Sequence, residues 1–298
     1  MERVINFKTV RDYNVFNNNN ETLHPLVSIV DLSKAEPRAG YKMTFGIYCV
    51  ILKQVKCGDI KYGNHNYDYQ EGTLVFFAPG QTVEVTGNEV FQPSGIALTF
   101  HPDLLLNTAL GKRMNDFNFF SYSTNEALHL SEKEKKIIAE CFDKISYELN
   151  QSIDKHSRML IASNIELFLN YCIRFYDRQF ITREHANKSI LERFEHLLNN
   201  YFISEKPQNI GLPSVSYCAG ELHLSANYFG DLIKKETGVS AQEYIQTKVI
   251  DVAKEKIFDN GKSISEVAYE LGFKYPQHFT RLFKQKVGVS PNEYRNLN

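Results

Sequence analysis

Three polar side chains, Gln277, Arg281 and Lys284, stand at spacings of four and three residues near the end of this 298-residue chain. At 100° per residue they share one side of a helix, while Phe279 and Phe283 point to the other side. Arginine can bond bidentately to guanine, glutamine can do the same to adenine, and lysine neutralises phosphate. The stripe is therefore either an interface for the major groove of a duplex or the solvated face of a surface helix.

A similar set of residues stands fifty positions earlier. The sequence GVSAQEY at 238–244 returns as GVSPNEY at 288–294, and Ala219 corresponds to Ala268 after a one-residue slip. Because the stripe and its flanking turns are both duplicated, the pattern favours contact with a duplex over a solvated face. The predicted DNA-binding residues are Asn227, Asp231, Lys234, Lys235, Lys274, Gln277, His278, Arg281, Lys284 and Gln285.

Each copy is predicted to contain a short helix, a tight turn and a longer helix. The expected helices are 213–222 and 225–237 in the first copy, and 263–271 and 276–287 in the second. Pro213 suits a first helical position and Ser225 an N-cap, while Ser263 and Glu266 form a capping box. Two such pairs are two helix-turn-helix units.

A continuous helix over 241–260, ended by Asn260-Gly261, is predicted to join the two units. Gly238 and Gly288 are expected to end the longer helices in the left-handed conformation. Capping boxes then restart the chain, with Ser240 paired to Glu243 and Ser290 paired to Glu293.

The two reading faces differ in charge. Asp231 occupies the position of Arg281, and an acid near phosphates is unfavourable unless it accepts from a cytosine amino group or pairs with Lys234 or Lys235. We therefore expect the second unit to do more of the base reading. The first unit is expected to contribute through Asn227 and its lysines.

Overall composition gives no direct sign of a nucleic-acid partner. The net charge is −1, and residues 190–298 contain thirteen Lys plus Arg and thirteen Asp plus Glu. Any binding must therefore come from where the charges lie. The 43% apolar content indicates a globular protein, and the absence of a long apolar run or an apolar leader predicts a cytoplasmic protein with no membrane partner.

The N-terminal third reads as β structure. The expected strands are 26–32, 43–55, 73–79 and 94–100, which suggest a small barrel or sandwich. Helices follow from Ser131, with Glu134 completing a capping box, and over 157–176. These helices either close the barrel or pair with a second copy of themselves. The asparagine-rich 14–20 is expected to be a mobile arm or loop, and 178–189 the domain boundary region.

Cysteine and histidine usage predicts no metal site. The five cysteines are scattered without a C-x-x-C pair, and Cys218 lacks basic neighbours, so a reactive thiol is not expected. The stretch 62–85 offers one imidazole, His65, with Val83 and Glu84 near the place where a further ligand would stand. His24 and His101 are expected to be structural residues. No cofactor is predicted.

From about residue 190 to its end, the chain resembles the DNA-binding domain of the AraC/XylS family of bacterial transcription regulators. The matching positions are Ala253-Lys254, Ile257-Phe258, Ile264, Val267-Ala268, Gly272-Phe273, Phe279, Phe283-Lys284, Gly288, Pro291 and Tyr294-Arg295. The resemblance implies two recognition helices in successive major-groove segments, roughly 34 Å apart on one side of the duplex. The first unit departs from the family pattern at Gly230 and Asp231, so a target sequence cannot be transferred.

The resemblance also implies an organisation and a function. The expected fold is α+β: a cupin-like β-barrel with dimerisation helices, then an all-α domain of two helix-turn-helix units joined by a linker helix. The expected boundaries are 1–185 for a ligand-sensing and dimerisation domain and 186–298 for the DNA-binding domain. The protein is then a homodimeric regulator and not an enzyme, with an operator duplex, a small-molecule effector and RNA polymerase as expected partners.

The sequence also allows two alternatives. In one, the N-terminal domain only dimerises or binds a protein partner. In the other, the chain is a cupin-type metalloenzyme with a DNA-binding appendage, against which the shortage of metal ligands counts.

Overall fold

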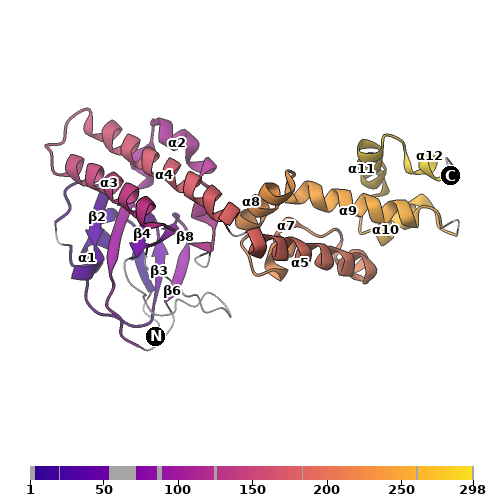
Figure 1. The fold of residues 1–298 in the computed structure, drawn as a ribbon, viewed down its shortest axis with the longest axis horizontal. Coiled ribbons are helices and arrows are strands. Elements are labelled where there is room, and N and C mark those ends of the chain that lie inside the picture. Colours follow the sequence, from indigo (N-terminus) through magenta and orange to yellow (C-terminus); the bar gives the residue numbers. More distant parts are fainter. Residues whose placement is uncertain are drawn as a thin grey trace. The chain divides into compact units, whose positions relative to one another are not determined.

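The computed structural model describes residues 4–19, 21–53, 72–85, 89–123, 126–182, 184–259 and 261–296, with only the backbone of 184–186. The chain divides into two compact units, Met1–Thr182 and Arg183–Asn298. All the strands found in these residues lie in the first unit, and the described part of the second unit is helical (Figure 1). The predicted α+β class is therefore confirmed. No helix of the described residues is long and apolar enough to cross a membrane.

Two sheets form the first unit. One has the strand order β1-β3-β6 and the other β2-β7-β4-β5-β8. The strands are β1 (Val4–Phe7), β2 (Val27–Asp31), β3 (Tyr41–Phe45), β4 (Tyr48–Lys53), β5 (Thr73–Phe77), β6 (Thr82–Val85), β7 (Gly95–Phe100) and β8 (Leu128–His129). The described strands thus form two open sheets and not the closed barrel that was expected, and three of them, β1, β6 and β8, were not predicted.

The run 43–55 does not form the single strand expected from its apolar pattern. It breaks between β3 and β4 at Gly46, whose amide donates to the carbonyl oxygen of Phe7 at 2.8 Å. A Cβ at Gly46 would approach the Lys8 Cα to 3.2 Å. The glycine therefore allows the chain to pass close to the N-terminal segment as it leaves one sheet for the other.

The main core of this unit lies between the two sheets. Phe45 of β3 and Phe77 of β5 stack with ring centroids 4.8 Å apart, and Phe7 of β1 lies 5.5 Å from Phe45. These side chains are almost fully buried and belong to one apolar cluster that also includes Tyr13 and Cys49. Aromatic side chains from both sheets therefore hold the sandwich together.

The expectation of a mobile arm or loop at 14–20 is wrong for residues 14–17, which end a capped helix, while residues 18–19 form a turn. Helix α1 (Val10–Phe16) is capped by Thr9, and Asn14 and Asn17 are fully buried. The Asn17 amide donates to the Tyr13 carbonyl at 2.8 Å and its oxygen accepts from Arg38 at 2.7 Å. Asn14 and Asn17 therefore serve as buried hydrogen-bonding groups, a use that composition cannot distinguish from a polar loop.

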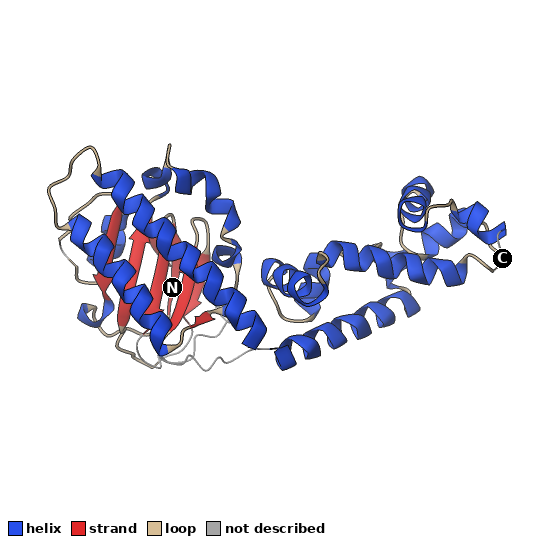
Figure 2. Ribbon diagram, turned by 45° about the horizontal axis from the view of Figure 1, so that its top comes forward, coloured by secondary structure: helices blue, strands red, loops and turns tan. Residues whose placement is uncertain are grey.

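Helices α3 (Glu132–Leu149) and α4 (Ser157–Thr182) cover the outer face of the five-stranded sheet (Figure 2). The capping box of Ser131 and Glu134 is present as predicted. Phe76 of β5 lies 6.1 Å from Tyr176 of α4, and Gln179 of α4 bonds to the backbone of β8 at His129. Helix α4 runs six residues past its predicted end at 176, so part of the expected boundary region 178–189 is helical.

Shorter helical segments connect these elements. They are η1 (Leu32–Lys34), η2 (Pro102–Leu105), α2 (Ala109–Arg113), η3 (Met114–Asp116) and η4 (Asn118–Ser121). Phe119 and Phe120 of η4 pack on Phe76 at 4.5 and 5.6 Å between ring centroids. Strand β5 is therefore buried on both faces, which explains why its sequence is continuously apolar.

The second unit contains the two predicted helix-turn-helix pairs. Its helices are α5 (Glu184–Ile203), α6 (Lys206–Ile210), α7 (Val215–Glu221), α8 (Ala226–Thr237), α9 (Ala241–Lys256), α10 (Ile264–Glu270), α11 (Pro276–Val287) and α12 (Pro291–Asn296). Ser214, and not Pro213, precedes α7 as its N-cap, and α9 ends four residues before the predicted stop. Gly238 and Gly288 end α8 and α11 in the left-handed conformation, as predicted.

The turns of the two pairs share one hydrogen-bond pattern. The Leu224 amide donates to the Ala219 carbonyl at 2.9 Å, and the Phe273 amide to the Ala268 carbonyl at 3.0 Å. These bonds confirm the one-residue slip inferred from the sequence. The positive-φ position in the turn is His223 in the first copy and Gly272 in the second.

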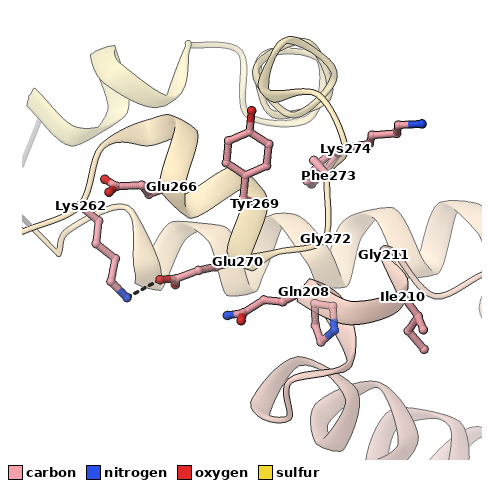
Figure 3. A pocket seen from close by; sticks show the side chains of 11 residues that line it. Gln208, Ile210, Gly211, Lys262, Glu266, Tyr269, Glu270, Gly272, Phe273 and Lys274 are labelled. Carbon is pink, nitrogen blue, oxygen red and sulfur yellow. Dashed lines mark ion pairs between the residues drawn. The ribbon is translucent and has the colours of Figure 1, made fainter.

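Gly272 also packs against the backbone that precedes the first pair. A Cβ at this position would lie 2.7 Å from the Gly211 carbonyl carbon, and the Gly211 oxygen accepts from the Tyr201 hydroxyl at 2.7 Å. A cleft of about 810 Å³ opens beside this contact, with the Lys262–Glu270 ion pair at one end, while Lys274 extends away from it (Figure 3). The second turn is therefore fixed to the segment that follows α5.

Replacing Gly272 by alanine is expected to lower the free energy of unfolding by about 2–4 kcal/mol, because strain at positive φ adds to a backbone clash. Gly288→Ala is the matched control, since its φ is 92° and a Cβ there meets nothing within 4 Å. We expect this control to lose only about 1–2 kcal/mol. Denaturant unfolding followed by circular dichroism measures both, and equal losses would show that the Gly211 contact contributes nothing.

Candidate nucleic-acid interface

Helix α11 presents its polar stripe to solvent. Phe279 and Phe283 are fully buried, with ring centroids 5.7 Å apart, and Phe273 packs on Phe279 at 5.3 Å. Burial of this face fixes the rotation of the helix, so its other face must point outward. All six DNA-binding residues predicted in the second helix-turn-helix pair are exposed, namely Lys274, Gln277, His278, Arg281, Lys284 and Gln285.

The exposed face of α11 is cationic. The helix contains Arg281, Lys284 and Lys286 and no acidic residue. Lys286 is turned away from the stripe and binds Glu243 of α9 at 3.0 Å. Arg281 and Lys284 therefore provide the positive charge on the stripe itself, which gives a field suited to phosphate although the unit is neutral overall.

Helix α8 holds the first set of predicted residues. Phe229, Leu232 and Ile233 are fully buried, and Phe229 meets Phe194 of α5 edge to face at 4.9 Å. On the other side, Asn227, Lys234 and Lys235 are exposed and Asp231 is half-buried. The structure thus brings the four predicted DNA-binding residues of the first helix-turn-helix pair to one surface of α8.

The charges on α8 balance. It contains Lys234 and Lys235 with Asp231 and Glu236, but the Glu236 carboxylate accepts from Asn187 of α5 at 3.0 Å. This bond holds Glu236 toward α5. Asp231 is therefore the acidic residue on the exposed stripe, in contrast with the cationic stripe of α11.

The two helices begin differently. The Ser225 hydroxyl accepts from the Tyr228 amide at 3.2 Å, whereas Tyr275 at the start of α11 makes no side-chain cap. The Tyr275 ring is half-exposed, lies 5.5 Å from the His278 ring and has the Lys274 ammonium 5.6 Å from its centroid. Sequence reasoning missed Tyr275 as a member of this surface. Its signal was an aromatic residue at the position where the first copy has the capping serine.

The predicted capping boxes are equal in sequence but not in structure. Ser290 and Glu293 form both bonds of the box, at 2.7 and 3.3 Å. At the equivalent start of α9, the Ser240 hydroxyl accepts from the Glu243 amide, but the Glu243 carboxylate accepts from Lys286 instead of from the Ser240 amide. A carboxylate that would close a local cap therefore links the connector helix α9 to α11 of the second pair instead.

The last helix fastens the second pair to the connector. The Arg295 guanidinium donates to the carbonyl oxygens of Ile257 at 2.6 Å and Lys262 at 2.9 Å. Tyr294 packs between Phe283 and Phe258, at 5.5 and 5.7 Å between ring centroids. These contacts occupy the orphan carbonyl at the C-terminal end of α9 and fix the position of α11.

Burial and hydrogen bonding explain the shifted pKa values in this unit. Hydrogen bonds from the backbone and hydroxyl of Ser290 lower the pKa of Glu293, and Ser263 does the same for Glu266. Burial, with a hydrogen bond to Glu195, raises the pKa of Tyr244 to about 12. Burial also raises the pKa of Cys218 to about 12, as expected for a structural thiol and not a nucleophile.

His24 and His101 have local structural roles, as expected. The ring nitrogen of His101 accepts from the Asp103 amide at 3.2 Å, and that of His24 accepts from the Leu26 amide at 3.1 Å. His65 lies outside the described residues. Within the described part of the chain, no group of three or more His, Cys, Asp or Glu side chains is placed to hold a metal ion.

Comparisons with known proteins place the second unit in a family. A family model for a helix-turn-helix domain matches residues 218–297. YfiF of Bacillus subtilis, described as an uncharacterized HTH-type transcriptional regulator, is 34% identical over 142 residues, which are 47% of this chain and 41% of that protein. The transposon Tn10 TetD protein of Escherichia coli is 33% identical over 143 residues, 48% of this chain and 91% of that protein.

Among solved structures, the C-terminal domain of AraT, a response regulator from Geobacillus stearothermophilus, matches with 26% identity and a TM-score of 0.33. The match covers 37% of this chain and 85% of that chain. The chain spans less than half the length of YfiF and of other curated relatives that it matches. The paired helix-turn-helix units and these relatives show that the chain belongs to the AraC/XylS family of bacterial transcription regulators.

Proposed function

We propose that this chain is a transcription regulator that binds a specific double-stranded operator, with α8 and α11 in successive major-groove segments. The observation that carries the proposal is the exposed, acid-free stripe of Gln277, Arg281 and Lys284 on α11. In helix-turn-helix proteins the second helix of each pair enters the groove and its side chains contact base edges. Family relatives named as HTH-type transcriptional regulators support a regulator and not an enzyme.

The second pair does more of the base reading. Arg281 and Gln277 supply the two bidentate donors of the interface, to guanine and adenine respectively, and Lys284 lies one turn on to meet phosphate. The first pair offers Asn227 as its amide donor beside a balanced set of charges. RNA polymerase enters as a partner only through the family resemblance.

Arg281→Ala should weaken binding to a selected operator by about 5- to 150-fold, and Asn227→Ala by less, because only Arg281 combines base recognition with charge. Lys284→Ala should weaken all duplexes alike and lower the log–log salt slope by about one. Fluorescence anisotropy with the full-length chain measures each change. Lys133→Ala, an exposed lysine of α3, controls for lost charge. An equal or larger loss from Asn227→Ala would refute the ranking.

The chain is also proposed to act as a homodimer through α4. Leu160 and Leu167 are seven residues apart on this helix and are 46% and 40% exposed, which is unusual for leucines on one helix face. Ile153, in the loop before the helix, is 62% exposed as well. A second copy of the same face would cover this stripe.

The double variant Leu160→Asp/Leu167→Asp should convert the protein to single chains, because two buried carboxylates would lose their hydration at the interface. Val15→Asp is the control, since Val15 of α1 is 55% exposed and lies off the stripe. Size-exclusion chromatography with light scattering distinguishes the states. A wild-type chain that is already monomeric at micromolar concentration would remove this part of the proposal.

A small-molecule effector is proposed to bind in the first unit, with DNA affinity as its output. The aromatic-rich interior between two open sheets supports an apolar or aromatic ligand. The 4.8 Å stacking of Phe45 on Phe77 favours the alternative, in which the interior is filled and the unit only dimerises or binds a protein.

These alternatives differ in what small molecules do to the full-length chain. An effector should raise the midpoint of thermal unfolding and change operator affinity in the same titration, because it binds one arrangement more tightly than another. Screening apolar and aromatic compounds by thermal shift, followed by anisotropy on the hits, tests this. Compounds that stabilise the chain but leave operator affinity unchanged would favour the alternative. Metal analysis of the purified protein tests the metalloenzyme alternative.

A further inference from the structure

Gly230 leaves a gap in the exposed face of α8. It stands three residues after Asn227 and four before Lys234, so the gap lies between these two side chains on the helix surface. A Cβ at Gly230 would meet no described atom within 4 Å. Glycine inside a helix lowers helix stability relative to alanine, so a reason is needed for its presence here.

Three other glycines of this unit have visible reasons that Gly230 lacks. Gly238 and Gly288 end helices at positive φ, and Gly272 combines positive φ with the contact to Gly211. Gly230 is in the middle of α8 with ordinary helical backbone. Neither backbone conformation nor packing within the described chain therefore calls for a glycine. Gly220 of α7 lacks such a reason as well, but the first helix of a pair crosses the DNA backbone, whereas the second helix, here α8, enters the groove. At Gly230, a close approach by another molecule is the remaining physical use of a missing side chain.

Asp231 lies beside this gap at the position of Arg281 in the second pair. A carboxylate offers acceptors only, and in the major groove the amino group of cytosine is a donor that Asp can read. The side chain is half-buried, so its freedom is already restricted before any duplex binds. Lys234, one turn on, supplies the cation that holds the neighbouring phosphate.

We infer that the duplex approaches α8 most closely at Gly230 and that Asp231 accepts a hydrogen bond from a cytosine amino group there. This inference rests on the proposed DNA-binding function and names the base that the first pair recognises. The gap lets the helix axis come near enough for a short side chain to reach the base edge. The longer Arg281 needs no such gap, and its pair has Thr280 at the equivalent position.

Gly230→Ala and Gly230→Leu test the close approach through two readouts of opposite sign. Alanine should raise the midpoint of thermal unfolding by roughly 2–4 °C, because it favours the helix. Both variants should nevertheless weaken binding to a duplex selected by the wild-type full-length chain from a randomised pool, by at least about fivefold for alanine and more for leucine. Gly220→Ala is the matched control, since a Cβ at Gly220 of α7 also meets nothing within 4 Å.

Stabilised Gly230 variants that bind the selected duplex as well as the wild type would overturn the inference. A Gly220→Ala variant that loses as much affinity as Gly230→Ala would overturn it too. If the wild-type chain selects no duplex at all, the proposed function itself fails, so the two failures are distinguishable.

Asp231→Asn tests the base assignment, because asparagine reads adenine where aspartate reads cytosine. Selection from the same randomised pool should give the wild type a preference of about 5- to 150-fold for a C·G pair at one position of the first half-site. The variant should instead prefer an A·T pair at that position. Its preference in the DNA segment that faces the second helix-turn-helix pair should be the same as that of the wild type. Identical selected sequences for both proteins would show that Asp231 does not read a base.

Discussion

The burial of one aromatic face on each longer helix is the constraint on which the interface depends. Phe279 and Phe283 are fully buried under α11, and Phe229 is fully buried under α8. A helix whose apolar stripe is held in a core cannot rotate, so its polar side chains have a fixed direction. The orientation of the interface is thus set by buried side chains that would not contact a duplex. Arg295 and Tyr294 extend the same support to the connector helix.

Much of the second unit could be predicted because its signals are local. Capping serines, helix-ending glycines and an apolar period near 3.6 act within a few residues, so α8 and α11 were placed correctly. The bond between the Glu243 carboxylate and Lys286, which replaces the second bond of the predicted capping box, could not be predicted because the two residues are 43 positions apart. Gly272 was recognised as a family match, but its contact with Gly211 appears only when the chain is folded.

The first unit shows where pattern reasoning stops. Strand content followed from Val, Ile and Phe runs, but the break at Gly46 depends on the approach of the Phe7 backbone, a tertiary effect. The asparagines of α1 were interpreted by composition, which favours a loop. Asn17 is buried because Arg38 and the Tyr13 carbonyl satisfy its polar atoms. Short-range sequence signals carry no information about such partners.

The N-terminal ends of α8 and α11 differ, so the two helix-turn-helix pairs are not interchangeable. Ser225 caps α8, whereas α11 begins with the Tyr275–His278 ring pair after a turn that is longer by one residue. The two helix-turn-helix pairs differ in the charge of their exposed stripes, in the start of the second helix and in the length of the turn. They would therefore not bind identical sequences, and neither pair could take the place of the other on the DNA. In the proposed DNA complex, a single chain would therefore lie on its site in one orientation. A dimer of such chains could face a promoter either as direct or as inverted copies, and the arrangement of sites would decide which.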